Sequence, residues 1–422
     1  MTTKSLRELS CADDYDPDSM PVAKAREFIQ AYLTPLTGNE MVNIRAALGR
    51  VLAEDIISRI NVPAHVNSAM DGYAVRFKDL NPQAETILHM IGTALAGKPF
   101  AAQVSGRECV RIMTGAVLPE GTDTVIMQEH ASADGQNIRF HGAHKQGQNI
   151  RQAGEDLAIG QVVLKSGKHI RPAELGLIAS LGIAEIAVRR RPRVAFFSTG
   201  DELRSIGSPL AEGEIYDSNR YTLYGMLTNM GAEILDMGVV KDDPASLERA
   251  LSEAASTADV VITSGGVSVG EADYIKELLG RLGEVVFWKI AMKPGRPLAY
   301  GKIGNSHFFG LPGNPVSVMV TFYQFVRDAL MILMGRKGDI AVPVLKAICT
   351  SALKKAPGRT EFQRGILSQD ANGVWSVCVT GEQGSGILRS MSEANCFIVL
   401  PETQGSVVPN TLVEVQVLEG LV

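Results

Sequence analysis

The sequence lacks a Cys-x-x-Cys pair, the spacing that is typical of zinc sites and of thiol–disulfide redox centres. Cysteine is also scarce. The 422 residues contain five, scattered along the chain: Cys11, Cys109, Cys349, Cys378 and Cys396. This odd, dispersed set indicates reduced and mostly buried thiols in a cytosolic protein, and it excludes a disulfide framework and a zinc site.

An excess of basic residues is also missing. Lys+Arg 41 against Asp+Glu 46 gives a formal net charge of −5. Nucleic acid and anionic membranes attract proteins that carry a basic surface, so we expect neither as a partner. Hydrophobic residues at 45% and charged residues at 21% are ordinary globular values, so the chain can bury a sizeable core.

No apolar run is long and uncharged enough to suggest a membrane span. The N-terminal segment MTTKSLRELSCADDYDPDSM is polar and acidic, without the apolar centre of a signal peptide. The longest apolar stretch, residues 315–334, contains Gln324, Arg327 and Asp328. We therefore predict that this stretch is a core helix and that the protein is cytoplasmic.

The pattern of apolar residues changes along the chain and predicts a multidomain α/β plus β architecture. A disordered lead over residues 1–17 precedes an N-terminal helix within 18–38, and a second short helix is expected over 45–54. Short β-rich runs between Gly, Pro and Asp turns predict a β domain over 57–153. Three strand–loop–helix units predict a doubly wound α/β domain over 182–340, and alternating residues predict a C-terminal β barrel over 341–422.

The loops of the α/β region carry the first functional signal. The loop 264–268 (SGGVS) and the loop 311–315 (LPGNP) each follow a predicted strand and precede a predicted helix. Ligands in open α/β sheets bind beyond the carboxyl ends of the strands, where helix N-termini present free N–H groups. A glycine loop alone can be a simple tight turn, but several such loops at one sheet edge favour a phosphate site.

Carboxylates cluster on the same loops and imply a cation. Beside a phosphate they would repel the ligand unless Mg²⁺ lay between them. Helix capping is the alternative, and it is favoured for Asp243, which precedes Pro244. A functional role is favoured for Glu202, Asp242 and Asp273.

Two further sets of residues have a functional and a structural interpretation. Lys289, Lys293 and Arg296 lie in WKIAMKPGRPLAYG, where they could bind an oxyanion or form a solvated loop. The second set lies in turn-rich segments, where ordinary turn chemistry is the alternative: Asp71, Thr114, Arg151 and Asp156. The arginine-rich run 189–193 is interpreted as a solvated linker. From the residues alone, we expect a Mg²⁺-dependent enzyme that acts on an anionic, phosphorylated ligand.

Nine motifs extend this interpretation. In chain order they are NSAMDGYAV, RIMTGA, GEDL, STGDEL, IYDSN, TSGGVSVGEADY, KPGRP, LPGNPVS and EFQRG. The series strongly resembles the molybdopterin molybdenumtransferases, the family of bacterial MoeA-type enzymes and of the E-domain of gephyrin. The resemblance covers about residues 20–420, nearly the whole chain.

The resemblance implies a fold and a reaction. It implies a four-domain homodimer with a linking domain built from segments 39–56 and 154–181, and an N-terminal helix that packs on the α/β molybdopterin-binding domain. The implied enzyme binds adenylylated molybdopterin and molybdate with Mg²⁺, hydrolyses the phosphoanhydride, releases AMP and inserts molybdenum to give molybdenum cofactor. The implied protein partners are the molybdopterin adenylyltransferase and apo-molybdoenzymes.

The resemblance also implies roles for residues. The pterin and phosphate would be cradled by the two glycine loops, at Gly265, Gly266, Ser268, Pro312 and Pro315. Glu202, Asp242 and Asp273 would position Mg²⁺ and the nucleotide. Lys289 and Lys293 would stabilise the cleaved anhydride and hold molybdate, with Arg296 as a further substrate contact. Asp71, as a catalytic residue, would face the same cleft from the partner subunit with Thr114, Arg151 and Asp156. Arg364 and Ser385 would complete an anion-binding rim.

Three other functions remain as alternatives. A molybdopterin adenylyltransferase would resemble residues 182–340, but its glycine motif usually continues TGGTG and it lacks the β domains. A non-catalytic scaffold would be expected to have lost some of the acids or lysines. Insertion of tungsten is the third, because the two oxyanions share shape and charge.

Overall fold

The computed structural model describes residues 19–266, 273–338 and 340–418, with the side chains of 273–277 and 287 left out. The predicted lead over 1–17 therefore lies outside the described residues. The chain divides into two compact units. The first contains the N-terminal part up to Glu40, Gly49–Val51 and Val188–Val422, and the second contains Met41–Leu48 and Leu52–Ala187. Two boundaries between the units fall within β1 (Asn39–Asn43) and β12 (Glu185–Arg189), and the other two lie on either side of Gly49–Val51.

The second unit is centred on a six-stranded sheet. Its strand order is β7 (Thr124–Met127), β4 (Gly72–Val75), β6 (Glu108–Ile112), β5 (Thr86–Ala94), β9 (Asn137–Phe140) and β8 (Ala131–Asp134). The unit also contains two small antiparallel pairs: β3 (Asn67–Ser68) with β10 (Ile150–Arg151), and β2 (Ile56–Ile57) with β11 (Val162–Leu164). Short helices complete the unit: η1 (Ile44–Ala47), η2 (Phe77–Asp79), η3 (Gln128–His130) and α3 (Pro172–Ser180).

The prediction of a helix over residues 45–54 is wrong. Only one 3-10 turn, η1, forms there, and Leu48 already has an extended backbone. Gly49 then adopts φ +75°, a left-handed conformation that interrupts a right-handed helix. The buried Val51 and Leu52 continue as isolated bridge residues rather than as a helical face.

The α/β part of the first unit is a doubly wound sheet, as predicted. Its strand order is β16 (Glu233–Val240), β13 (Arg193–Thr199), β17 (Val260–Ser264), β21 (Ser306–Leu311), β20 (Pro297–Ile303) and β18 (Gly283–Lys289). The first four strands are parallel, β20 runs antiparallel to β21, and β18 runs antiparallel to β20. A small parallel pair, β14 (Leu203–Arg204) and β15 (Ile215–Tyr216), lies between β13 and the next helix in sequence.

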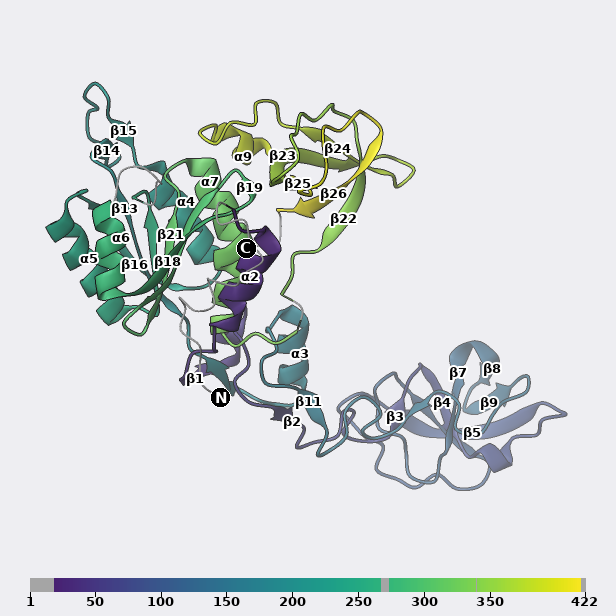
Figure 1. The fold of residues 1–422 in the computed structure, drawn as a ribbon. Coiled ribbons are helices and arrows are strands. Elements are labelled where there is room, and N and C mark those ends of the chain that lie inside the picture. The colour runs from purple at the N-terminus through teal and green to yellow at the C-terminus, as the bar shows by residue number, and fades with distance from the viewer. Residues whose placement is uncertain (1–18, 267–272, 339, 419–422) are drawn as a thin grey trace. The chain divides into compact units, whose positions relative to one another are not determined.

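Helices cover both faces of this sheet (Figure 1). On one face, α5 (Pro244–Thr257) and α6 (Asp273–Leu282) pack on alternate strand residues such as Phe197 and Val261. On the other face, Phe196 and Ile262 join a larger core that includes α2 (Val22–Ala31), α4 (Ser218–Asn229) and the long helix after β21. Neighbouring residues of one strand thus point into the two cores on the two faces of the sheet. This is why these strands are apolar throughout.

The long helix consists of α7 (Pro315–Thr321), a π-helical turn η4 (Phe322–Val326) and α8 (Arg327–Leu333). By length and composition Pro315–Leu333 could cross a membrane, but 89% of its apolar window is buried inside the protein. The prediction of a core helix is confirmed. Arg26 of α2 donates to the side-chain oxygen of Gln324 at 2.8 Å, so α2 packs against the long helix.

The C-terminal strands form a closed five-stranded barrel. The strand order is β23 (Thr360–Gln369), β24 (Trp375–Val379), β22 (Val344–Cys349), β26 (Thr411–Val417) and β25 (Cys396–Leu400), and β25 pairs back onto β23. Helix α9 (Arg389–Glu393) precedes β25, and the two-residue strand β19 (Met292–Lys293) adds to β23 from outside the ring. The predicted fold class, α/β with a β domain and a C-terminal barrel, is confirmed.

Two smaller expectations can also be compared with the structure. Four cysteines are described as free thiols, of which Cys109, Cys349 and Cys396 are buried, as predicted. The interpretation of 189–193 as a solvated linker is wrong for Arg190. Its guanidinium forms two hydrogen bonds of 2.7 Å with the Asp259 carboxylate and fixes the entry into the sheet.

Candidate functional site

Four parallel strands end at one edge of the α/β sheet. The register aligns Ser198 of β13 with Ser264 of β17, and Ser264 with Leu311 of β21. Each strand runs directly into a loop that the sequence analysis singled out. Gly200 and Glu202 follow β13, Asp242 follows β16, Gly265 follows β17 and Pro312 follows β21.

A cavity of about 560 Å³ lies beyond these strand ends. Its lining residues come from all four loops, from the start of α4, and from the loop before α9: Thr199, Gly200, Glu202, Leu203, Ile215, Tyr216, Asp217, Ser218, Asn219, Asp242, Ser264, Gly265, Gly266, Gly313, Asn314, Pro315, Gly386 and Leu388. The volume suits an organic molecule of nucleotide size. Five of the predicted residues are brought together here: Glu202, Asp242, Gly265, Gly266 and Pro315.

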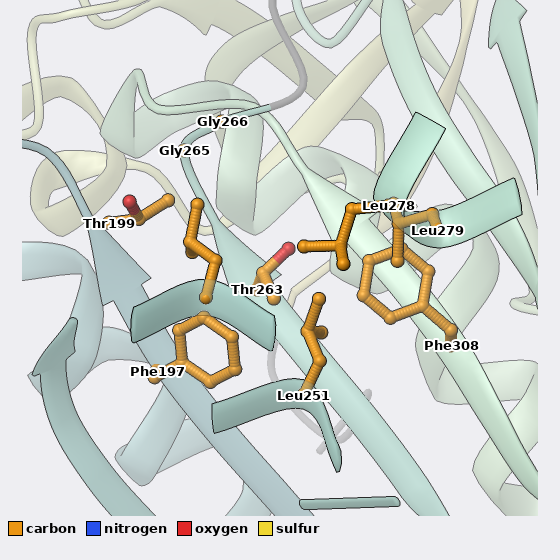
Figure 2. Close-up of a pocket in the computed structure, with 10 residues that line it drawn as sticks. Phe197, Thr199, Leu251, Thr263, Gly265, Gly266, Leu278, Leu279 and Phe308 are labelled. Atoms are coloured by element: carbon orange, nitrogen blue, oxygen red, sulfur yellow. The ribbon is translucent and has the colours of Figure 1, made fainter. Parts of the chain in front are cut away.

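The loop after β17 requires glycine at position 265. Gly265 has φ +94°, and a Cβ placed on it would lie 2.4 Å from the carbonyl oxygen of Thr199. Below the loop, a small apolar cavity of about 20 Å³ lies among Phe197, Leu251 and Phe308 (Figure 2). The loop therefore rests on an apolar floor and presents backbone rather than side chains to the larger cavity.

Three carboxylate residues line the large cavity: Glu202, Asp217 and Asp242. Thr199 donates its hydroxyl to Asp242 Oδ1 at 3.3 Å, which ties the end of β13 to the loop after β16. Glu202 lies two residues beyond Gly200 in the first loop. The third predicted acid, Asp273, is the first residue of α6, but its side chain lies outside the described residues, as does all of Ser268.

The sequence analysis did not single out Asp217 and Asn219 as site residues. Asp217, 2% exposed, caps α4 by accepting the Arg220 N–H at 3.1 Å through Oδ1. Asn219 donates to Ser264 Oγ at 2.9 Å and to the Gly313 carbonyl at 2.6 Å, so it joins the loops after β17 and β21. The second oxygen of Asp217 and the amide oxygen of Asn219 are buried without hydrogen-bond partners. The available signal was the IYDSN motif, which contributes to the family resemblance.

The three predicted cations are not among the residues that line the cavity. Lys289 ends β18, and Lys293 lies in β19, where its Nζ is 3.6 Å from Glu361 Oε1. Arg296 is exposed. The turn between Lys293 and Arg296 packs on the long helix, because a Cβ on Gly295 would lie 2.6 Å from Thr321 Oγ1. The same helix begins at Pro315, at the cavity wall.

Arg364 is a buried cation with only neutral partners. It is 1% exposed, and its guanidinium donates to Ser390 Oγ and to the Gly384 carbonyl, each at 3.0 Å. It forms no ion pair with any described carboxylate, and burial lowers its pKa to about 10. The carbonyl of Ser385, in the loop that Arg364 supports, accepts the Val316 N–H at the start of α7.

In the second unit, Asp71 and Thr114 form a tight pair. The backbone N–H and the hydroxyl of Thr114 both donate to Asp71 Oδ1 at 2.7 Å. These two hydrogen bonds, the backbone one first, lower the pKa of Asp71. Arg151 and Asp156 are exposed residues of the same unit, and their side chains take no part in this pair.

Three family profiles match successive parts of the chain. A profile described as the MoeA N-terminal region (domain I and II) matches residues 20–182. One described as a probable molybdopterin binding domain matches residues 195–331, and one described as the MoeA C-terminal region (domain IV) matches residues 346–418. The domain that carries the cavity thus belongs to a class described as molybdopterin-binding.

Relatives extend the similarity to the whole chain. A molybdopterin molybdenumtransferase of Haemophilus influenzae is 49% identical over 88% of this chain and 92% of its own length. A gephyrin of Dictyostelium discoideum is 33% identical over 89% of this chain and 59% of its own length. A crystal structure of a molybdopterin biosynthesis moeA protein from Pyrococcus horikoshii has a TM-score of 0.82 at 30% identity, and covers 95% of this chain and 100% of that one. The chain belongs to the molybdopterin molybdenumtransferase family.

Proposed function

We propose that this protein is the enzyme that inserts molybdenum into molybdopterin: it binds adenylylated molybdopterin and molybdate, cleaves the phosphoanhydride and releases AMP. Family membership supports the transferase reaction. The observation that carries the proposal is the 560 Å³ cavity at four parallel strand ends, lined by backbone glycines, three carboxylates and the start of α7. Such an edge suits a phosphorylated ligand.

The loops would bind the substrate through backbone groups. Gly265 and Gly266 present no side chains; because the Gly265 N–H donates to the Leu311 carbonyl at 3.1 Å, Gly266 would be the backbone group of this pair that approaches phosphate oxygens. Asn314, the residue before α7, makes no side-chain capping hydrogen bond, while the Val316 N–H is already held by the Ser385 carbonyl, so the start of α7 would attract the ligand through its partial positive charge. Ser268 and Pro312 are proposed to complete the cradle around the pterin and phosphate.

The acids fit a magnesium ion. Mg²⁺ in nucleotide enzymes is usually held by one or two carboxylates together with substrate phosphates and water. Glu202 and Asp242, which both line the cavity, would supply such ligands, and Asp273 is proposed as the third. Among the described residues no group of three His, Cys, Asp or Glu side chains could hold a metal by itself, so the substrate phosphates would complete the coordination. When bound, the ion would neutralise charge on the anhydride.

The cations would receive the oxyanion and the charge of the cleaved anhydride. Lys289, Lys293 and Arg296 are proposed to hold molybdate from one side, and Arg364 with Ser385 from the C-terminal barrel. Arg364 supports this role because it is buried and paired only with neutral oxygens, so it retains the capacity to attract an anion. A preorganised charge in a site that excludes water contributes several kcal/mol to transition-state stabilisation.

The proposal also includes a second copy of the chain. Asp71, Thr114, Arg151 and Asp156 are proposed to act on the substrate from the partner subunit of a homodimer. Asp71 is suited to such a role because its pKa is lowered, which keeps the carboxylate ionised. We further propose a cytoplasmic protein that exchanges its substrate and product with a molybdopterin adenylyltransferase and with apo-molybdoenzymes.

The test follows AMP release from adenylylated molybdopterin with Mg²⁺, with and without molybdate, in the presence of an apo-molybdoenzyme. We expect molybdate-dependent AMP release together with reconstitution of the reporter enzyme. Substrate binding without AMP release under any oxyanion would overturn the proposal in favour of a scaffold. Tungstate in place of molybdate tests the choice of metal.

Two variants test the residue roles. We expect Asp71→Ala and Lys293→Ala each to abolish insertion without unfolding the protein. Asp134→Ala and Lys337→Ala, which remove exposed residues of the same types from the same units, are the matched controls. Full activity of either test variant would remove that residue from the mechanism.

A further inference from the structure

The C-terminal barrel reaches the cationic turn through a parallel strand pair. Strand β19 pairs with β23 so that Met292 lies opposite Thr360 and Lys293 lies opposite Glu361. The Thr360 N–H donates to the Ala291 carbonyl at 2.8 Å, which fixes this register. A residue of the barrel is thereby placed next to a lysine that the chain carries on its α/β domain.

Glu361 is a buried acid that pairs with an exposed lysine. Its side chain is 6% exposed and that of Lys293 is 52% exposed, with 3.6 Å between Lys293 Nζ and Glu361 Oε1. Gln363, two residues along β23 and therefore on the same face, donates to Glu361 Oε2 at 2.9 Å and to the Lys354 carbonyl at 3.2 Å. One carboxylate oxygen is thus fixed by an amide, and the other is left to the ammonium.

Burial of the Glu361 carboxylate is unfavourable in free energy, so its presence in the barrel needs a reason. A carboxylate removed from water is unfavourable unless it is paired, and a buried ion pair seldom adds stability over apolar side chains of similar volume. Lys293 forms the one ion pair that Glu361 makes among the described residues. The pair is therefore better explained by what it does for Lys293 than by what it does for the stability of the barrel.

The backbone on the other side of Lys293 is held as well. The turn that follows Lys293 contains Gly295 at φ +98°, where a Cβ would lie 2.6 Å from Thr321 Oγ1 and 3.6 Å from the Ser317 carbonyl. Ser317 and Thr321 belong to α7, whose first residue lines the cavity. Lys293 thus has its backbone fixed against the α/β domain and its ammonium fixed by the barrel.

We propose that Glu361 is a positioning residue for the oxyanion substrate and acts through Lys293. An ammonium has three N–H donors. Glu361 lies at ion-pair distance from this ammonium and restricts the flexible lysine side chain, which otherwise loses conformational entropy each time it binds a ligand. The N–H donors of Lys293 are thereby held toward a tetrahedral oxyanion. Glu361 does not touch the anion, because like charges repel. This inference rests on the proposed role of Lys293 in molybdate binding.

The experiment measures KM for molybdate and kcat for AMP release in Glu361→Gln. We expect KM to rise about tenfold with kcat nearly unchanged, because the lysine keeps its charge and loses its position. Glu361→Asp, which restores the charge on a shorter side chain, should recover part of the affinity. The matched control is Glu393→Gln, which breaks the exposed Arg389–Glu393 pair of the same domain and should leave KM unchanged.

A double-mutant cycle separates positioning from folding. In a Lys293→Met background, where the affinity for molybdate is measured by equilibrium binding rather than by turnover, Glu361→Gln should weaken binding no further, since there is no ammonium left to position. A wild-type KM in Glu361→Gln, or an equal further loss in the Lys293→Met background, would overturn the inference. If Glu361→Gln does not fold, an unchanged KM in Glu361→Asp would overturn it instead. Full activity in Lys293→Met alone would contradict the proposed role of Lys293 and is distinguished from these outcomes.

Discussion

Thr114 holds a single oxygen of Asp71 with two donors. Its backbone N–H and its hydroxyl both lie 2.7 Å from Asp71 Oδ1, on an exposed turn that would otherwise leave the carboxylate free to rotate. Hydrogen bonds to the ionised form favour that form, so the pKa of Asp71 is lowered, mainly by the backbone N–H and then by the hydroxyl. Thr114 thus holds the Asp71 carboxylate in one orientation and in its ionised form.

Removal of the hydroxyl should raise the pKa of Asp71. Thr114→Val keeps the shape of the side chain and the backbone donor, and loses the second hydrogen bond. We expect the pKa to move part of the way back toward its ordinary value, as measured by NMR titration of the carboxyl carbon. Because the folded-state pKa is lowered, the stability that Asp71 contributes is present above its unfolded pKa and is lost as the pH falls through the folded pKa.

The control for this titration is Thr122→Val. Thr122 lies in the same unit, and its hydroxyl donates to the Pro119 carbonyl at 2.7 Å rather than to a carboxylate. Thr122→Val should leave the pKa of Asp71 unchanged. An unchanged Asp71 pKa in Thr114→Val would show that the hydroxyl does not contribute.

Arg364→Lys should weaken anion binding more than it weakens the fold. Lysine keeps the charge but cannot donate to Ser390 and Gly384 in the fork geometry of a guanidinium. We expect at least a tenfold rise in KM for molybdate, together with a fall in stability of about 1–3 kcal/mol from the unpaired buried acceptors. Arg359→Lys, the same change on an exposed turn, is the control. An unchanged KM in Arg364→Lys would restrict Arg364 to a structural role.

His307 should make the protein sensitive to mild acid. It is 5% exposed, and burial is the main reason that its pKa falls from 6.5 to about 4. Between these two values the unfolded chain binds a proton that the folded chain does not, so stability is full above pH 6.5 and declines as the pH falls toward 4. The shift corresponds to about 3 kcal/mol.

Chemical unfolding at a series of pH values measures this effect. His307→Gln cannot take up the proton, so its free energy of unfolding should fall less steeply between pH 6.5 and 4. His141→Gln, a change at an exposed histidine, should keep the wild-type slope. Equal slopes in wild type and His307→Gln would contradict the assignment.

The sequence predicts the α/β edge well because each strand there is continuous with its functional loop. An apolar run such as 259–263 is followed at once by Ser264-Gly265-Gly266, so parallel pairing alone brings such loops together. Glu202 and Asp242 could be predicted for the same reason. Local sequence and sheet topology are sufficient at these positions.

Asp217 and Asn219 could not be predicted as part of the cavity from such patterns. They follow the two-residue strand β15, which lies beyond an exposed loop, and no apolar period leads to them. The burial of Asn219 depends on contacts with Ser264 and Gly313, which lie 45 and 94 residues further along the chain. Arg190 was misinterpreted for the same reason, since its partner Asp259 lies 69 residues further along the chain.

Gly265→Ala should distort the cavity through two effects, backbone strain and a steric clash. The left-handed φ of +94° would cost a substituted residue about 1–3 kcal/mol. In addition, the new methyl group would lie 2.4 Å from the Thr199 carbonyl, a backbone atom that cannot move without shifting the end of β13. Because Thr199 also donates to Asp242, the shift should reach the acidic side of the cavity.

Gly207→Ala isolates the first of these two effects. Gly207 has φ +87° and nothing within 4 Å of the position of an added Cβ, so this variant carries the backbone strain without the clash. We expect Gly265→Ala to lose more stability in chemical unfolding than Gly207→Ala, and also to lose affinity for adenylylated molybdopterin, which Gly207→Ala should retain. If the two variants lost equal stability and both bound the substrate normally, the close approach of Gly265 to Thr199 would have no part in shaping the site.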